Sequence, residues 1–80
     1  MIQLFTIEGC PYCAKVLRVL DELDLKFSQI DAPHGSKNRE KLLELGGEDQ
    51  VPFLYIAEKD VAMYESDDII EYIRHEYTEK

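Results

Sequence analysis

The first half of the chain shows three successive patterns of apolar and polar positions. Residues 2–7 alternate loosely between apolar and polar side chains, which is typical of a strand in a partly covered sheet. From Pro11 to Leu23 the apolar residues recur at steps of three and four, which predicts an amphipathic helix with proline in its first turn. Residues 25–30 favour a second strand, and residues 31–36 contain the Pro, Gly and Ser that are typical of a loop.

The second half of the chain predicts four more elements. Residues 37–45 favour a short helix that begins after Ser36 and ends at Gly46-Gly47. Residues 53–57 form a continuous apolar run, as expected of a buried central strand, and a turn at residues 58–60 leads to a strand from Val61 to about residue 64. Ser66 then has the character of an N-cap before a final helix, whose apolar face consists of Ile69, Ile70, Ile73 and Tyr77.

The predicted order of elements is therefore β-α-β-α-β-β-α. A strand-helix-strand opening implies a parallel pair with a right-handed crossover, whereas two late strands joined by a short turn imply an antiparallel hairpin. The fold class that follows is α/β with a mixed four-stranded sheet. Residues 1–80 contain no linker or repeat, so we expect a single domain.

Composition narrows the classes of function. The 80 residues are 45% hydrophobic and 32% charged, with a formal net charge of −8. A chain of this size builds one small core, so we expect its active site to be superficial. The acidic balance argues against binding nucleic acid or an anionic membrane surface. No apolar run is long enough to cross a bilayer, and the first residues do not resemble a signal peptide, so we expect a cytoplasmic monomer.

The two cysteines, Cys10 and Cys13, stand in a C-x-x-C pattern between the first predicted strand and the first predicted helix. At a helix N-terminus, free backbone N–H groups and the helix dipole favour a thiolate at Cys10 over a thiol. Cys13 lies one turn further along, on the apolar side of the helix, where it should be less exposed and less acidic. The pattern predicts an attacking cysteine, Cys10, and a resolving cysteine, Cys13.

Two alternatives for the cysteine pair remain open. Half of a zinc site would require two further ligands, and the remaining histidines and carboxylates do not have the spacing of such a site, so no metal is expected. Two inert buried thiols are the second alternative. The position of the pair between strand and helix makes a redox pair the stronger interpretation.

Two further segments indicate a ligand site. Pro52 stands directly before the buried strand, where a proline is tolerated, and a cis Val51-Pro52 bond would leave the Val51 backbone free to pair with an extended ligand. The sequence alone leaves the cis and trans isomers open. Residues 64–68, Tyr-Glu-Ser-Asp-Asp, place a hydroxyl and free N–H groups at a helix start, which suits a carboxylate, beside acids that suit an ammonium group. A plain helix cap accounts equally well for the same residues.

Together these segments resemble the glutaredoxin family over essentially the whole chain. Residues 10–13, Cys-Pro-Tyr-Cys, match the dithiol glutaredoxin signature, Val51-Pro52 matches the cis-proline element of that family, and Asp67-Asp68 matches its Asp pair at a helix start. The resemblance implies a thioredoxin fold, with glutathione as co-substrate and disulfide-bearing proteins and glutathione mixed disulfides as substrates. It also implies roles for individual residues: a nucleophile at Cys10, a resolving thiol at Cys13, and a glutathione site formed by Tyr12, Val51, Pro52, Glu65, Ser66 and Asp67.

The chain departs from glutaredoxins at several positions. Tyr64-Glu65-Ser66 replaces the usual glycines before the Asp pair and is similar to the N-terminal domain of glutathione transferases, in which a Glu-Ser pair holds the γ-glutamyl group. Ile7 and Asp49 occupy positions where glutaredoxins carry a lysine and a basic or polar residue. Lys15, Lys37 and Arg39 are the candidate replacements for the missing cations.

The leading hypothesis is a glutathione-linked thiol-disulfide oxidoreductase. One alternative is a glutathione-binding domain like the N-terminal domain of glutathione transferases, although 80 residues leave no space for the helical second domain of those enzymes. A redoxin that thioredoxin reductase reduces is another. A carrier that holds an iron–sulfur cluster between two protomers with glutathione is a third, which the proline and the second cysteine disfavour.

Overall fold

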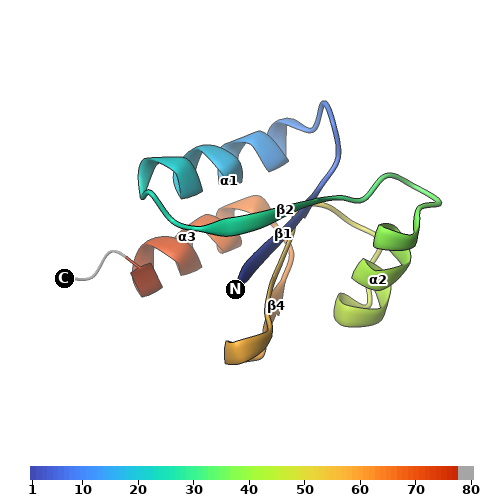
Figure 1. Cartoon of the computed structure of the whole chain (residues 1–80). Helices are drawn as coiled ribbons and strands as arrows, with labels where there is room; N and C mark the ends of the chain where they lie inside the picture. Colours follow the sequence, from blue (N-terminus) through green and yellow to red (C-terminus); the bar gives the residue numbers. More distant parts are fainter. Residues whose placement is uncertain (78–80) are drawn as a thin grey trace.

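A computed structural model of the chain describes residues 1–77, and its sheet has the predicted mixed topology (Figure 1). The order of elements is β1 (Ile2–Thr6), α1 (Pro11–Glu22), β2 (Phe27–Asp31), α2 (Lys37–Gly46), β3 (Phe53–Ile56), a short 3₁₀ turn η1 (Ala57–Lys59), β4 (Val61–Met63) and α3 (Ser66–Tyr77). The spatial order of strands is β2-β1-β3-β4, with β1 and β2 parallel and the other two pairings antiparallel. The three residues of the predicted domain that follow Tyr77 lie outside the described part.

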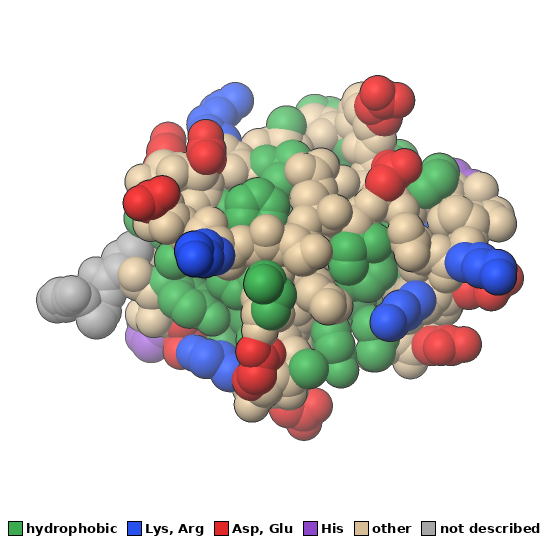
Figure 2. Space-filling model, in the orientation of Figure 1, with side chains coloured by type: hydrophobic (Ala, Val, Ile, Leu, Met, Phe, Trp, Pro, Cys, Tyr) green, Lys and Arg blue, Asp and Glu red, His purple; other side chains and the backbone are tan. Residues whose placement is uncertain are grey.

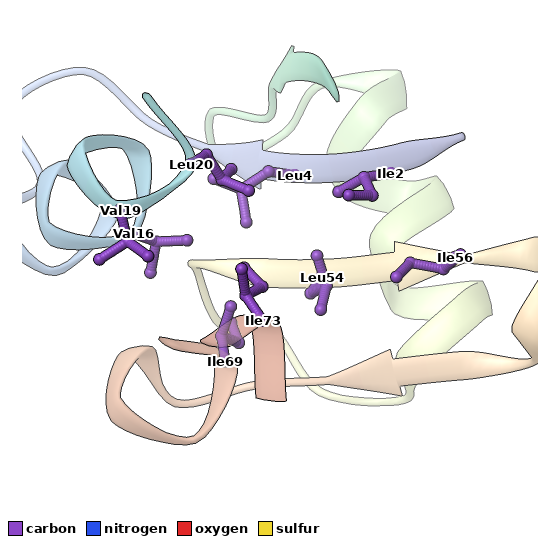
Figure 3. Packing of buried hydrophobic residues seen from close by; sticks show 9 residues of the cluster. All are labelled: Ile2, Leu4, Val16, Val19, Leu20, Leu54, Ile56, Ile69 and Ile73. Carbon is purple, nitrogen blue, oxygen red and sulfur yellow. The ribbon is translucent and has the colours of Figure 1, made fainter. Parts of the chain in front are cut away.

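Helices cover both faces of this sheet, because alternate residues of its central strands point in opposite directions. Helices α1 and α3 lie together on one face, and α2 lies on the other (Figure 1). Leu4 and Leu54 point toward α1 and α3, whereas Phe5 and Phe53 point toward α2. The larger cluster comprises Ile2, Leu4, Val16, Val19, Leu20, Leu54, Ile56, Ile69 and Ile73 (Figure 3).

The structure shifts several predicted boundaries. The predicted strand at residues 25–30 begins two residues later, at Phe27, because the Leu25 N–H donates to the Leu20 carbonyl in the turn that follows α1. Asp31, predicted in the loop, completes β2 opposite Thr6. Ser66 is the first residue of α3 rather than its N-cap, because the carbonyl of Glu65 accepts the Ile69 N–H. Local pattern cannot resolve such one- and two-residue differences, which tertiary pairing decides.

The predicted end of α2 at Gly46-Gly47 is confirmed, and it is also a crowded contact. Gly47 caps the helix with a left-handed φ of 89°. Gly46 lies against the Tyr64 hydroxyl and the Phe53 ring, where an added Cβ would fall within 2.6 Å of the ring. The Tyr64 hydroxyl donates to the Glu48 carbonyl at 2.8 Å and accepts the Glu48 N–H at 3.0 Å. A side chain from the end of β4 thus fixes the loop after α2.

Gly46→Ala should therefore destabilise the protein. Alanine normally favours a helix by up to about 1 kcal/mol over glycine. Here the methyl group must displace an aromatic ring and a bonded hydroxyl, and overpacking of this kind costs about 1–3 kcal/mol. Urea unfolding curves of Gly46→Ala and of Lys41→Ala, an exposed control on the same helix, measure the difference. If Gly46→Ala were as stable as the parent protein, the Tyr64 hydroxyl and the Phe53 ring would move aside at no cost in free energy, contrary to this prediction.

Candidate functional site

Cys10 occupies the N-cap of α1, where the sequence predicts the nucleophile. Its backbone is extended, with φ −89° and ψ 111°, and Pro11 follows as the first helical residue. The Cys10 Sγ accepts the Cys13 N–H at 3.2 Å, so the sulfur replaces one of the missing hydrogen bonds of the first turn. The sulfur therefore stands at the N-terminus of a 12-residue helix, with one backbone N–H directed at it.

Cys13 lies behind Cys10 and is only 2% exposed. Burial, together with a hydrogen bond to Cys10, raises the pKa of the Cys13 thiol from 9.0 to about 12, while the Ile7 backbone and the charge of Arg39 act in the opposite direction. At neutral pH Cys13 is therefore a protonated thiol. Cys10 is partly exposed at the helix start and Cys13 is buried behind it, and this asymmetry matches the predicted division into an attacking and a resolving cysteine.

The six residues predicted to bind glutathione all line one cavity. This cavity, of about 470 Å³, lies between the start of α1, the segment before β3 and the start of α3, and is lined by Tyr12, Gln50, Val51, Pro52, Glu65, Ser66 and Asp67. The bond between Val51 and Pro52 is cis. Tyr12 is 60% exposed at the rim, whereas Ser66 is buried. We call these seven residues the Pro52 cavity.

Glu65 has an unusual backbone for a residue with a side chain. Its φ is 70°, in the left-handed region, and such a conformation costs about 1–3 kcal/mol and persists only where the surroundings impose it. The turn directs the Glu65 side chain toward the neighbouring wall, where its carboxylate accepts a hydrogen bond from the Gln50 side chain at 3.2 Å. Strain of this kind is typical of ligand sites.

The cations that the sequence offered as replacements do not line the Pro52 cavity. Lys15 donates to the Asp67 carboxylate at 2.9 Å and connects α1 with α3 at the rim. Arg39 is buried, and it donates to the Ala32 carbonyl at 2.8 Å and to the Asp49 carboxylate at 2.5 Å. Lys37 is exposed at the start of α2. Arg39 therefore anchors the segment that leads to the cavity, and Asp49 serves as its partner.

Sequence reasoning missed two side chains that shape the site. Gln50 lines the cavity and holds Glu65, and Tyr64 holds Glu48. The position of Gln50 directly before Val51-Pro52 is a signal that could have identified it. Nothing in the sequence places the Tyr64 hydroxyl on a loop 16 residues away.

Neither a metal centre nor a membrane span is found within residues 1–77. No group of three or more His, Cys, Asp or Glu side chains in this range is arranged to hold a metal ion. None of the helices that the structure describes is long and apolar enough to cross a bilayer.

Comparison with known proteins places the chain in a family. The family model for the glutathione S-transferase N-terminal domain matches residues 4–80. The chain belongs to the glutathione S-transferase N-terminal domain family. Its fold is the thioredoxin-like fold of that domain, with the predicted order of elements.

The chain is also similar to individual proteins. The chain is 26% identical to glutaredoxin 3 of Escherichia coli over 55 residues, which are 69% of this chain and 66% of that protein. It superposes with a TM-score of 0.81 on a glutathione S-transferase from the Antarctic clam Laternula elliptica, at 31% identity over 95% of this chain and 35% of that one. A glutathione transferase homologue from Sulfitobacter with bound glutathione gives a TM-score of 0.80 at 16% identity, with coverage of 96% and 37%. The chain thus spans about a third of the length of these transferases.

Differential alkylation tests the asymmetry of the two sulfurs. Because burial raises the Cys13 pKa to about 12, the reactive thiolate of Cys13 is scarce at pH 7.5 and increases about tenfold for each pH unit above that. Iodoacetamide at pH 7.5 should modify the folded protein once, at Cys10, and modify Cys13 only after denaturation. Peptide mass mapping reads the sites. In Cys10→Ser, labelling of native Cys13 as fast as a free thiol would contradict this.

Proposed function

We propose that this chain is a glutathione-linked thiol-disulfide oxidoreductase that reduces protein disulfides and glutathione mixed disulfides. The observation that supports this most directly is the position of Cys10. Its sulfur caps α1, accepts the Cys13 N–H, and lies one residue from Pro11 and two from Tyr12, which stands at the rim of the Pro52 cavity. Cys10 is not among the residues that line this cavity, so a ligand held there must extend past Tyr12 for its disulfide to meet the sulfur. We also propose a monomer that works in the cytoplasm, where thiols are kept reduced.

The reaction proceeds by successive thiol–disulfide exchanges. The Cys10 thiolate attacks one sulfur of the substrate disulfide, a Cys10–substrate disulfide forms, and the other substrate sulfur leaves as a thiolate. Cys13, once deprotonated, or the thiolate of a reduced glutathione then attacks the Cys10 sulfur, the second substrate thiolate leaves, and Cys10 remains in a disulfide with Cys13 or with glutathione. A Cys10–Cys13 disulfide is first opened by one glutathione to the Cys10–glutathione disulfide, and in both routes a last glutathione attacks the bound glutathione sulfur, which releases Cys10 as a thiolate and forms glutathione disulfide. The electrons thus pass from two glutathione molecules to one substrate disulfide.

The Pro52 cavity offers groups that suit glutathione. The backbone of Val51 can pair with the extended tripeptide, and Ser66 with the N-terminal N–H groups of α3 suits the γ-glutamyl carboxylate. Glu65 and Asp67 suit the γ-glutamyl ammonium group. The glutathione bound to the Sulfitobacter homologue, which shares this fold, supports the assignment of the ligand.

The family membership favours a second candidate function, glutathione binding in the manner of a transferase. Residues 4–80 match the transferase N-terminal domain, and Glu65 and Ser66 both line the cavity. In this function glutathione remains reduced, its thiolate attacks an electrophile, and Cys10 undergoes no redox change. Conjugation of 1-chloro-2,4-dinitrobenzene without disulfide reduction would favour the second candidate over the first.

Serine variants of the two cysteines separate their roles. Cys10→Ser should abolish reduction of the mixed disulfide between glutathione and 2-mercaptoethanol, because the first exchange needs this sulfur. Cys13→Ser should retain a substantial fraction of the activity, since a second glutathione can resolve the intermediate. NADPH consumption coupled to glutathione reductase measures both. If Cys13→Ser lost activity while Cys10→Ser kept it, the roles of nucleophile and resolving thiol would be reversed. If the protein turned over with thioredoxin reductase but not with glutathione, thioredoxin reductase would be its electron donor.

Ser66→Ala tests the ligand site. Hydrogen bonds to a charged group are worth about 1.5–3 kcal/mol, so the loss of this hydroxyl should weaken binding of S-methylglutathione by roughly tenfold or more. Isothermal titration calorimetry measures the change. Ser28→Ala, on edge strand β2, is the matched control and should bind as the parent protein does. Equal affinities of the two variants would place the γ-glutamyl group elsewhere.

A further inference from the structure

A second hollow opens beside Cys10 and is separate from the Pro52 cavity. It has a volume of about 470 Å³ and is lined by Ile7, Glu8, Gly9, Cys10, Pro11, Cys13, Ala14, Leu17 and Gln29. The two cavities have no lining residue in common. Cys10 and Cys13 are both among its lining residues, so an occupant of this hollow lies next to the partly exposed Cys10, with the buried Cys13 behind it.

This hollow continues into an acidic extension. An adjoining cavity of about 310 Å³ shares Ile7, Glu8 and Gln29 with it and adds Thr6 and Asp31. The two together run from the sulfurs, past the apolar side chains of Ile7 and Leu17, to the carboxyl end of β2. In the space-filling view, acidic side chains lie over the region of the β1–α1 connection (Figure 2). We call this continuous surface the Glu8 groove.

Among the described residues, no cation accompanies the acids of the Glu8 groove. Within residues 1–77, neither the Glu8 carboxylate nor the Asp31 carboxylate makes an ion pair, whereas Asp67 at the rim of the Pro52 cavity is paired with Lys15. Both residues are exposed. The described lining of the groove contains no Lys, Arg or His. An occupant that places a cation here gains a partner, and an anionic occupant is repelled.

We propose that the Glu8 groove binds the polypeptide next to the disulfide under attack, with an apolar residue beside the substrate cysteine and a Lys or Arg at the acidic end. This assignment rests on the proposed oxidoreductase function and identifies its protein substrates as basic around the reactive cysteine. Charge complementarity favours a basic polypeptide here, because Glu8 and Asp31 have no ion-pair partner among residues 1–77. The Pro52 cavity is also acidic, but there Lys15 pairs with Asp67, and Ser66 at the start of α3 suits the γ-glutamyl carboxylate of glutathione. Glutathione and the substrate polypeptide thus occupy different surfaces on the two sides of Cys10.

The chemistry in this groove is a single-turnover exchange. The reduced protein attacks a symmetric peptide disulfide through Cys10, and one peptide leaves as a thiolate. Deprotonated Cys13 then attacks the Cys10–peptide disulfide, and the second peptide leaves. The two cysteines become oxidised to a disulfide, and the peptide disulfide is reduced to two thiols, so no other reductant is needed.

Three pentapeptide disulfides that differ at one position test the proposal. Symmetric dimers of a peptide with one cysteine, carrying Lys, Gln or Glu two residues from it, are mixed with the pre-reduced 80-residue protein at roughly 20 mM ionic strength without glutathione. For each protein, rates are divided by its rate with bis(2-hydroxyethyl) disulfide. Close charge pairs at a surface contribute up to about a factor of five each, so the Lys peptide should react roughly five to twenty times faster than the Glu peptide. Salt at about 0.5 M should remove most of this preference.

Two double variants locate the source of the preference. Glu8→Gln with Asp31→Asn should bring the Lys-to-Glu ratio close to one, whereas Asp21→Asn with Glu44→Gln, an equal loss of charge on other surfaces, should leave it as in the parent. Equal ratios in the two variants would attribute the preference to the net charge and overturn the proposal, as would a parent ratio near one. Ala14→Tyr fills the groove without a charge and should slow all three peptides relative to the small disulfide.

The reference substrate keeps this test separate from the proposed function. If the parent protein does not reduce bis(2-hydroxyethyl) disulfide, the oxidoreductase function itself fails. If it reduces that compound but treats the three peptides alike, the oxidoreductase function stands and the assignment of the Glu8 groove fails.

Discussion

The site depends on one register, the antiparallel pairing of β1 with β3. Phe5 lies opposite Phe53, and the two rings contact each other with centroids 5.4 Å apart. Because the strands run in opposite directions, the chain that leaves β1 for Cys10 lies next to the chain that enters β3 from Pro52. A shift of β3 by one residue against β1 would turn Phe53 to the face opposite Phe5, so the packing of the two rings on one face also fixes the segment before β3 relative to the chain that leads to Cys10.

Hydrogen bonds and ion pairs of Arg39 and Lys15 then hold the segments around the Pro52 cavity in place beside the paired strands β1 and β3. Arg39 connects α2 to the end of β2 through the Ala32 carbonyl and to the loop before Val51 through Asp49. Lys15 connects α1 to the start of α3. The chain lacks cations at the positions typical of glutaredoxins and instead has Lys15 and Arg39 near the cavity. Both are paired with carboxylates of the protein itself. The described lining of the Pro52 cavity therefore contains two acids, Glu65 and Asp67, and no Lys or Arg.

Much of this could be predicted from the sequence because the determining signals are local. The periodicity of α1 and the Cys-x-x-Cys spacing identify the sulfurs, and the apolar run of β3 with Pro52 before it identifies the second wall. The residues that sequence reasoning could not place are joined by contacts between distant segments, such as Lys15 with Asp67 across 52 positions. Such pairs follow from how α1 packs on α3, which no local pattern encodes. The two-residue displacement of β2 arises from a backbone hydrogen bond, since the Leu25 N–H is bonded to the Leu20 carbonyl in the turn after α1 rather than to a neighbouring strand.

The Tyr64 hydroxyl, which both donates to and accepts from the backbone of Glu48, has a mechanical consequence for recognition. It couples the end of β4 to the loop after α2, and the hydrogen bond between Gln50 and Glu65 repeats that connection slightly further along both segments. These two neighbouring hydrogen-bonded contacts join the segment before β3 to the segment at the start of α3, which are two walls of the Pro52 cavity. The spacing of these walls is therefore set by contacts within the protein and is in place before a ligand arrives.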